Sequence, residues 1–494
     1  MMWCPDTPIP GKAGTSFFTI GHTSTSVSLA CGLAKARELK GGHENIIAVI
    51  GDGSLSGGEA YEGLSNAGEM GTNLIIVVND NEMSIAENHG GLYQNLKELR
   101  DTEGRSSCNF FRSLGLDYLY VGEGNDIPSL VAAFAKVKDT SRPTVVHIHT
   151  QKGKGYAPAE ADREEFHWEM PFDLETGKPK VDCSGMEDYH SLTGKFLLEK
   201  MKEDHTVVAI SSGTPTVIGF TPERRKQAGR QFVDVGIAEE HAVALASGIA
   251  AGGGHPVYGV YSTFIQRCYD QLSQDLCING NPAVITVFMG TVAGMNDVTH
   301  LGFFDIPLIS NIPNMVYLAP TCSEEYFAML EWAVRQTEYP VAIRVPGVAV
   351  VHRKEEFDTD YSELNRYKMT ARGETVAILA LGSFYDLGQA LKNKLREESG
   401  VEATLINPRY ITGLDEPMLE ELKVGHRIVV TLEDGVLDGG FGEKIARYYG
   451  NSEMRVLNYG LRKEFADRYN LDELMKTNRL TDKQMAEDIA GILE

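Results

Sequence analysis

Cysteine and tryptophan are scarce in this chain of 494 residues, which holds seven of the former and three of the latter. The cysteines are odd in number and scattered, and no two of them form a Cys-x-x-Cys pair: Cys4, Cys31, Cys108, Cys183, Cys268, Cys277 and Cys322. This distribution argues against a disulfide framework and against a structural zinc site. We therefore expect reduced cysteines that act as packing residues.

The chain also lacks an uninterrupted apolar run long enough to cross a bilayer, and it lacks the basic and apolar regions of a signal peptide. Basic residues are also few: the chain has 46 Lys and Arg against 69 Asp and Glu, which gives a net charge of −23. Nucleic acids and anionic membranes bind clustered Lys and Arg, so this balance disfavours both as partners. Phosphorylated small molecules remain compatible, since metal ions and helix N-termini can hold them. We predict a cytoplasmic protein that acts on small molecules.

Short apolar runs rich in β-formers alternate with helical patterns along the whole chain, which is typical of α/β folds with parallel sheets. A stretch with three prolines, residues 151–185, separates a first group of such runs from a second group that starts at Val207. A charged stretch, residues 354–368, precedes a third group that starts at Thr375. We predict an α/β protein with three consecutive domains and mainly parallel sheets, covering residues 1–185, 186–353 and 354–494.

The same patterns place individual elements. Helices are expected at residues 25–39, 59–70, 239–251 and 264–276, and a glycine-rich turn at 439–442 opens another. Strands are expected at 46–50, 74–78 and 144–148, then near residues 207, 233, 257, 283, 315 and 341, and at 376–380, 403–406 and 428–432. Ligands of open α/β sheets bind at the carboxyl ends of the strands, so candidate site residues should follow these runs.

Two neighbouring strands of the first domain end in residues suited to a metal ion and a diphosphate. The first runs into Gly51-Asp52-Gly53, and the second runs into Asn79-Asp80-Asn81. Mg²⁺ prefers hard oxygen ligands and keeps coordination positions for phosphate and water. The protein could therefore contribute three ligands: Asp52, Asn81 and a backbone carbonyl. A bare Gly-Asp-Gly would indicate only a glycine-rich turn at a sheet edge. Its pairing with Asn81 favours the metal site.

This pairing resembles the diphosphate-binding motif of thiamine-diphosphate enzymes. The run from Asn79 to Ile85, Asn-Asp-Asn-Glu-Met-Ser-Ile, is similar to that of the 1-deoxy-D-xylulose-5-phosphate synthase family. The resemblance implies a transketolase-like architecture, thiamine diphosphate and Mg²⁺ as cofactors, and a metal site made by Asp52, Asn81 and the backbone carbonyl of Met83. It also implies that Gly53 and Ser54 contact the cofactor at the metal end.

Two further segments of the first domain are similar to the family. Gly21-His22-Thr23-Ser24-Thr25-Ser26 opens a helix with small polar residues, and the likeness implies that Gly21, His22 and Thr23 contact the cofactor. Gly153-Lys154-Gly155-Tyr156, with Phe166-His167 after it, implies that Tyr156 flanks the cofactor and that His167 lies at the reacting carbon. Without the resemblance, a helix N-cap and a surface histidine would be the simpler interpretations.

In the second domain, Ile237-Ala238-Glu239-Glu240-His241-Ala242 is similar to the family's Ile-Ala-Glu-Gln-His-Ala. The likeness implies that Glu239 bonds to the cofactor's aminopyrimidine ring and favours the tautomer that can take the thiazolium C2 proton. The alternative is a helix-start carboxylate that meets the helix dipole. Glu240 replaces the usual glutamine, and its charge would either repel Glu239 or face solvent.

The segment from Tyr261 to Gln271 also resembles the family closely. It implies that Phe264 stacks on the aminopyrimidine and that Tyr261 and Arg267 face substrate, although aromatic residues on such a helix could also fill the core. Thr299-His300 matches a Thr-His of the family, which makes His300 a candidate donor to a developing alkoxide.

Three positions depart from the family pattern: Met289 and Gly347 stand where the family has arginines, and Asn296 stands where it has an acidic residue. Arg344 is kept, and the resemblance makes it the candidate for binding the substrate phosphate. Only 20 residues precede Gly21, whereas the family has roughly a hundred there. We therefore expect either an incomplete first domain, a separate chain that supplies the missing part, or an impaired protein.

The reaction implied by the resemblance condenses pyruvate with D-glyceraldehyde 3-phosphate to give 1-deoxy-D-xylulose 5-phosphate and CO₂. Its product feeds isoprenoid, thiamine and pyridoxal pathways, and family members are homodimers. Two alternatives stay open at this point. A related ketol transferase with a different acceptor aldehyde would explain Met289 and Gly347, and an inactive or split half would explain the short N-terminus.

Overall fold

The computed structural model describes residues 17–493 except 170, 182–184 and 348. Cys4 and Cys183 lie outside the described residues, and the five cysteines inside them are free, as expected. Three sheets follow one another along the chain, and every strand pair in them is parallel apart from the one that β11 (Lys368–Ala371) makes with β13 (Thr404–Asn407). The predicted α/β class with mainly parallel sheets is confirmed.

The first sheet has the order β1-β2-β4-β3. Its strands are β1 (Ile47–Gly51), β2 (Ile75–Asp80), β3 (Asp117–Val121) and β4 (Thr144–His149). The helices of this unit are α1 (Ser26–Leu39), α2 (Gly58–Glu69), α3 (Leu92–Asp101), α4 (Phe110–Ser113), α5 (Ile127–Val137) and α6 (Ala157–Ala161), with 3₁₀ turns η1 (Gly53–Ser56) and η2 (Glu165–His167). Apolar residues of α1 and α2 bury one face of the sheet, and α5 packs on the other.

The second sheet has the order β6-β5-β7-β8-β10-β9. Its strands are β5 (Val207–Ser211), β6 (Phe232–Asp234), β7 (His255–Tyr261), β8 (Val284–Phe288), β9 (Val316–Leu318) and β10 (Val341–Arg344). Its helices are α7 (Tyr189–Glu203), α8 (Pro222–Ala228), α9 (Glu239–Ala251), α10 (Asp305–Ser310) and α11 (Ser323–Arg335), with 3₁₀ turns η3 (Pro215–Ile218) and η4 (Gly229–Gln231).

One predicted helix differs from the structure. The segment expected as a single α-helix at 264–276 forms a 3₁₀ helix, η5 (Phe264–Cys268), and then a π-helix, η6 (Gln271–Cys277). Over so short a segment, apolar spacing does not fix whether the hydrogen bonds run to the third, fourth or fifth residue. Such π-helical segments are rare and often accompany functional sites.

The third sheet has the order β11-β13-β12-β14-β15, where β12 is Thr375–Ala380, β14 is His426–Val436 and β15 is Arg455–Leu461. Its helices are α12 (Tyr385–Ser399), α13 (Glu416–Leu422), α14 (Phe441–Tyr449), α15 (Leu471–Thr477) and α16 (Asp482–Leu493), after a short 3₁₀ turn, η7 (Gly382–Phe384). The turn at 439–442 opens α14, as expected.

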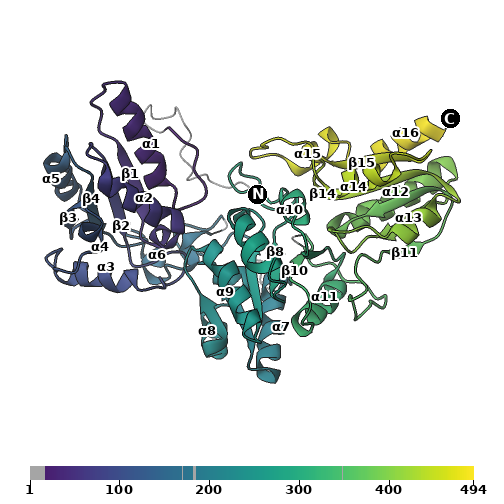
Figure 1. Cartoon of the computed structure of the whole chain (residues 1–494), viewed down its shortest axis with the longest axis horizontal. Coiled ribbons are helices and arrows are strands. Elements are labelled where there is room, and N and C mark those ends of the chain that lie inside the picture. Colours follow the sequence, from purple (N-terminus) through teal and green to yellow (C-terminus); the bar gives the residue numbers. More distant parts are fainter. Residues whose placement is uncertain (1–16, 170, 182–184, 348, 494) are drawn as a thin grey trace.

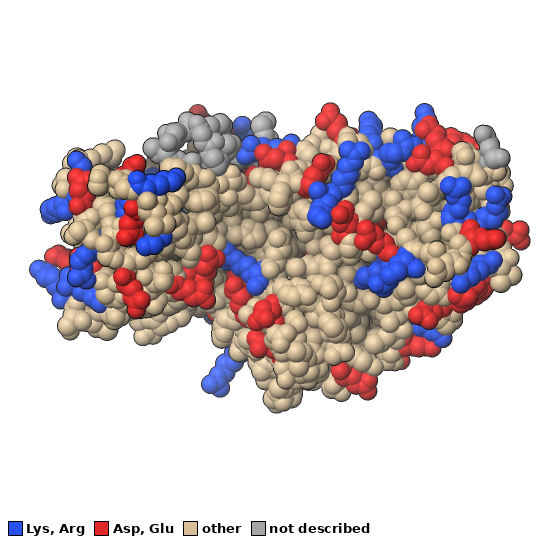
Figure 2. Space-filling view, turned by 45° about the horizontal axis from the view of Figure 1, so that its top comes forward, with Lys and Arg blue, Asp and Glu red and all other residues tan. Residues whose placement is uncertain are grey.

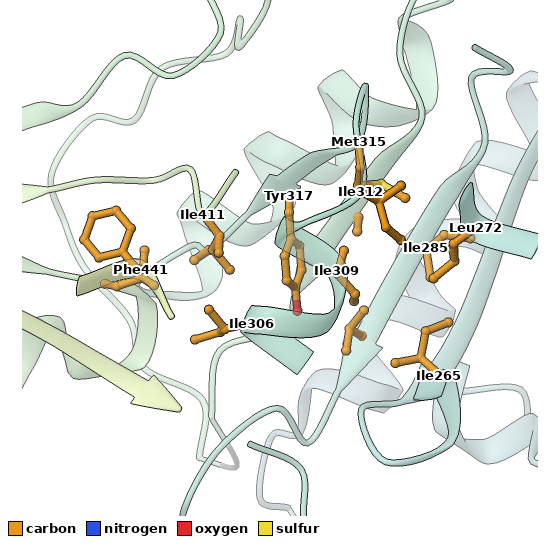
Figure 3. Close-up of a cluster of buried hydrophobic side chains, with 14 of the residues drawn as sticks. Ile265, Leu272, Ile285, Ile306, Ile309, Ile312, Met315, Tyr317, Ile411 and Phe441 are labelled. Atoms are coloured by element: carbon orange, nitrogen blue, oxygen red, sulfur yellow. The ribbon is translucent and has the colours of Figure 1, made fainter. Parts of the chain in front are cut away.

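The second unit lies between the other two (Figure 1), and one apolar cluster joins it to the third. In Figure 3, Ile306 and Tyr317 of the second unit lie beside Ile411 and Phe441 of the third. Because burying apolar area is the main favourable term in association, this shared core should hold the two units in one arrangement.

Charged side chains of both signs are mixed over the face shown in Figure 2, so Lys and Arg do not gather into one patch there. None of the helices in the described part of the chain combines the length and the apolar character that crossing a bilayer requires.

Candidate active site

The metal motif lies where β1 and β2 end. The two strands pair in parallel, with Gly51 opposite Asn79, and the Asp52 amide donates to the Asn79 carbonyl over 3.0 Å. Parallel pairing brings both carboxyl ends to one edge of the sheet. Asp52 and Asn81 therefore follow their strands at the same edge of the sheet.

Asp52 is almost completely buried and lacks a cationic side chain as an ion-pair partner among the described residues. Its carboxylate accepts a hydrogen bond from Asn88 Nδ2 at 2.7 Å. Burial, followed by the negative charge of Asp80, raises the pKa of Asp52 to about 7. A divalent cation would offset both effects, because an opposite charge favours the ionised form.

The donor set fits Mg²⁺. The Oδ1 atom of Asn88 is buried beside Asp52 and has no hydrogen-bond partner within the described part of the chain, so an acceptor oxygen is available for a cation or a donor there. The described residues contain no cluster of three or more His, Cys, Asp or Glu side chains that could hold a metal. A site of one carboxylate, one amide and one backbone carbonyl, completed by phosphate and water, is of a different kind and needs no such cluster.

The backbone around the site is closely packed. A Cβ on Gly53 would lie 2.5 Å from the Cβ of Ser84, so only glycine allows η1 to approach the loop that follows β2. In that loop, Asn81 Oδ1 accepts from the Met83 amide at 3.1 Å, and Glu82 has φ of +69°. The side-chain oxygen of Asn81 and the backbone of Met83 are thereby held in one tight turn.

Behind Asn81 lies a buried polar network that sequence reasoning missed. Asp80 is fully buried, contacts His147 Nε2 at 2.9 Å and forms an ion pair with Arg100. The other ring nitrogen of His147 is hydrogen-bonded to Tyr118 at 2.7 Å. Burial would raise the pKa of Asp80, but hydrogen bonds and charge from His147 and Arg100 hold it below its usual value. The network ties the loop that follows β2 to β4 and α3.

Glu239 approaches this region from the second unit, at the first residue of α9. It is 2% exposed, and Arg267 Nη1 donates to its carboxylate at 3.2 Å. Burial raises the pKa of Glu239, and the charge of Arg267 opposes that shift. Arg267 also donates to the backbone carbonyl of Thr23 in the first unit. The Ile237 amide donates to Ser56 Oγ at 2.8 Å, so η1 and the start of α9 meet directly.

Four aromatic rings lie together near Arg267, the hydrogen-bond partner of Glu239. His22 is hydrogen-bonded to Thr263 Oγ1 at 2.8 Å, and its ring centroid lies 5.1 Å from Phe264 and 5.7 Å from His300. Tyr261 packs against Phe264 at 5.9 Å. Burial, followed by the charge of Arg267, lowers the pKa of His22 to about 4, so this ring is neutral near pH 7. Burial also lowers the pKa of His300.

Gly21 is required by this packing, because a Cβ there would lie 1.9 Å from Thr299 Oγ1. Thr23 contributes its carbonyl to Arg267, and Ser54 contributes its carbonyl to Ser24 Oγ at 2.8 Å. Most predicted site residues thus form two adjoining groups. One contains Asp52, Gly53, Ser54, Asn81 and Met83, and the other contains Gly21, His22, Thr23, Glu239, Tyr261, Phe264, Arg267 and His300.

Tyr156 and His167 lie on a separate segment. The Tyr156 ring packs against Phe166 and Phe172, and its hydroxyl donates to the Leu174 carbonyl at 3.1 Å. His167 lies in η2 and is exposed. Lys152, earlier in the same segment, donates to the carbonyl of Ser84 at 2.7 Å. This bond links the segment to the loop that follows β2.

Arg344 differs from its predicted role. Its guanidinium donates to both carboxylate oxygens of Asp305, at 2.7 and 3.1 Å, and to the backbone carbonyl of Asp434 at 2.6 Å. The side chain is 4% exposed. A substrate phosphate would have to displace buried, charge-assisted bonds, so the geometry gives no support for the predicted phosphate contact. Arg344 instead ties β10 to the end of β14.

Truncating Arg344 should therefore destabilise the fold. Arg344→Ala leaves the carboxylate of Asp305 buried and unpaired, and we expect a loss of about 3–5 kcal/mol in the free energy of unfolding. Chemical denaturation checks this. Arg335→Ala, which breaks a surface ion pair with Glu331, should cost at most about 1 kcal/mol. Equal stability of the two variants would contradict the structural role of Arg344.

The three departures from the family pattern occupy different surroundings. Met289 packs at the margin of the second unit's core, with φ of +57°. Asn296 donates to the Tyr469 carbonyl at 3.1 Å and so contacts the third unit. Gly347 has φ of +52°, a conformation that favours glycine.

Comparisons with known proteins agree with this arrangement. A family model described as 1-deoxy-D-xylulose-5-phosphate synthase matches residues 12–108. Models of the transketolase pyrimidine binding domain and of the transketolase C-terminal domain match residues 187–350 and 366–485.

Solved structures show the transketolase-like fold. A transketolase from Pichia stipitis in complex with sedoheptulose-7-phosphate matches with a TM-score of 0.52 at 15% identity, over 95% of this chain and 79% of that one. A split-gene transketolase, described as an inactive beta4 tetramer, matches with a TM-score of 0.52 at 20% identity, over 62% of this chain and 98% of that one.

Curated relatives are closer. A 1-deoxy-D-xylulose-5-phosphate synthase from Lachnoclostridium phytofermentans is 36% identical over 87% of this chain and 74% of its own length. One from Clostridium beijerinckii is 35% identical over 96% of this chain and 82% of its own length. The chain belongs to the 1-deoxy-D-xylulose-5-phosphate synthase family.

Proposed function

We propose that this protein is a transferase that condenses pyruvate with D-glyceraldehyde 3-phosphate to 1-deoxy-D-xylulose 5-phosphate and CO₂, with thiamine diphosphate and Mg²⁺. The observation that carries the proposal is the meeting of the Asp52–Asn81 edge with the buried carboxyl of Glu239. These groups come from different sheets and are held together by bonds of Arg267 and Ser56 across the two units. Family membership supports the same reaction.

The residues present suit the cofactor. Asp52, Asn81 and the Met83 carbonyl would hold Mg²⁺, with Gly53 and Ser54 beside the diphosphate. Gly21, His22 and Thr23 would contact the cofactor from the start of α1, and Phe264 would stack on its pyrimidine ring. When bound, thiamine diphosphate supplies the carbon centre that accepts the acyl group of pyruvate as CO₂ leaves.

Glu239 would act on a proton. Because burial raises its pKa, its carboxyl can carry a proton at higher pH than a solvated glutamate and can share that proton with an aminopyrimidine nitrogen. Arg267 limits this shift and fixes the carboxylate in place.

The neighbouring aromatic and histidine side chains would face the reacting atoms. Tyr261, Arg267 and His300 would contact substrate, with His300 donating to the oxygen on which negative charge develops. Tyr156 would flank the cofactor and His167 would lie at the reacting carbon, and these two roles draw support from the family resemblance alone.

The assembly expected from the sequence is likewise proposed: a cytoplasmic homodimer with domains at 1–185, 186–353 and 354–494. A separate N-terminal chain that completes the first unit is also proposed. Its support is that β1 forms an edge of the first sheet and exposes Ile47 and Val49 by 54% and 62%. A strand of a parallel sheet is usually covered on both faces, so another polypeptide segment would find an apolar surface there.

The function is tested by incubating the protein with Mg²⁺, thiamine diphosphate and pyruvate, with and without D-glyceraldehyde 3-phosphate, and by measuring CO₂ and the product by mass spectrometry. We expect 1-deoxy-D-xylulose 5-phosphate to form only with both substrates. Equal turnover with unphosphorylated aldehydes would point to a ketol transferase with another acceptor. The absence of turnover although both cofactors bind would contradict the proposed activity.

A further inference from the structure

The loop between β2 and α3 carries a residue that the motifs do not assign. Asn88 lies seven positions after Asn81, and its amide group reaches back to the candidate metal ligand Asp52. The Nδ2 atom donates to Asp52 Oδ2 at 2.7 Å, and the Oδ1 atom of the same amide is buried with no hydrogen-bond partner among the residues that the structure describes. A buried amide oxygen without a partner is unusual, because an unsatisfied buried acceptor destabilises the fold.

The orientation of this amide follows from its neighbour. The NH₂ group of Asn88 faces Asp52 Oδ2, because an amide nitrogen only donates hydrogen bonds and a carboxyl oxygen accepts them. The atom left over is then the carbonyl oxygen, which is an acceptor. An unprotonated phosphate oxygen cannot satisfy it, whereas a cation, a water molecule or an N–H group can.

The loop is anchored on both sides, so Asn88 is held in place. Glu87 forms an ion pair with Arg225 of the second unit at 2.9 Å, and an isolated β-bridge joins Glu87 to Met83. After the loop, the Tyr93 hydroxyl donates to the backbone carbonyl of Asp52 at 3.1 Å. Asn88 is therefore fixed between the turn at Asn81–Met83 and the second unit.

We propose that Asn88 is a further residue of the Mg²⁺–diphosphate site: its NH₂ group orients the Asp52 carboxylate, and its carbonyl oxygen faces the bound cation and its water shell. This inference rests on the proposed function only in taking the cation with its diphosphate as the occupant. Residues that orient metal ligands typically change metal affinity by about 10-fold to 100-fold when they are replaced.

The test measures Mg²⁺ affinity by calorimetric titration in the presence of saturating thiamine diphosphate, together with the thermal midpoint with and without Mg²⁺. Asn88→Ala removes the hydrogen bond to Asp52 and the proposed contact with the cation. It should therefore weaken Mg²⁺ binding by about 10-fold or more. Asn88→Asp places a second carboxylate beside Asp52. It should lower the thermal midpoint without metal and give a larger upward shift on adding Mg²⁺ than the wild-type protein shows.

Asn95→Ala is the matched control, because the Asn95 amide is hydrogen-bonded to Cys108 and Phe110 of the first unit. The Asn95→Ala variant should leave Mg²⁺ affinity unchanged. Wild-type affinity in Asn88→Ala, or an Mg²⁺ shift in Asn88→Asp no larger than wild type, would overturn the inference. Failure of the wild-type protein to bind Mg²⁺ and thiamine diphosphate would instead count against the proposed function.

Discussion

Glu239→Ala is expected to reduce turnover by about 10²–10⁴-fold while thiamine diphosphate and Mg²⁺ still bind. The carboxyl is buried at the start of α9, and burial holds its pKa above the usual glutamate value, as a group that exchanges a proton with the cofactor requires. The proposed metal ligands lie in the first unit and are untouched by this change. Binding should therefore remain measurable by calorimetry when the rate of product formation has collapsed.

Glu240→Gln is the matched control for this prediction. Glu240 is the next residue of α9 and is only partly buried, and the substitution restores the residue usual in the family. We expect near wild-type turnover from it. Unchanged turnover in Glu239→Ala would refute the assigned role of Glu239, whereas loss of both turnover and binding would indicate that Glu239 mainly supports the fold.

Asp52→Ala is expected to abolish Mg²⁺-dependent binding of thiamine diphosphate. Asp52 is the single carboxylate among the proposed metal ligands, and neutral oxygens alone hold a hard divalent cation weakly. In the apo protein, however, a buried carboxylate with a raised pKa is unfavourable when ionised, so removing it should not lower the thermal midpoint. The expected signature is an intact fold without any stabilisation by Mg²⁺ and cofactor.

Thermal unfolding with increasing Mg²⁺ at fixed thiamine diphosphate measures this effect, since a ligand that binds only the native state raises the midpoint. Asp117→Ala, an exposed aspartate at the start of β3, serves as the control and should respond like the wild-type protein. An Asp52→Ala variant with the same Mg²⁺ response as wild type would remove Asp52 from the site.

Much of the fold was predictable because local patterns coincide with the final structure. The apolar run before Asp52 is a strand, the run before Asn79 is its parallel partner, and α9 begins and ends at Glu239 and Ala251, as predicted. The placement of Asp52 and Asn81 at one edge of the sheet follows from these facts alone, because parallel strands end at the same side of a sheet.

The features that the sequence did not predict depend on contacts between distant segments. The pairing of Arg344 with Asp305 and Asp434 joins two sheets, and a motif match in one strand carries no information about it. The contact of Asn88 with Asp52 likewise arises from the path of an irregular loop. His147 and Asp80 lie inside apolar strands, where a polar residue indicates a buried network, so this contact could have been predicted from the sequence.

The central claim is that one Mg²⁺ ion lies between Asp52 and Asn81 and anchors thiamine diphosphate next to Glu239. A crystal grown with Mn²⁺ in place of Mg²⁺ and with thiamine diphosphate tests it most directly through the anomalous scattering of the metal. We predict a single strong anomalous peak in contact with the side-chain oxygens of Asp52 and Asn81, with the pyrimidine ring beside Glu239. A peak elsewhere, or cofactor bound without metal at this edge, would contradict the account.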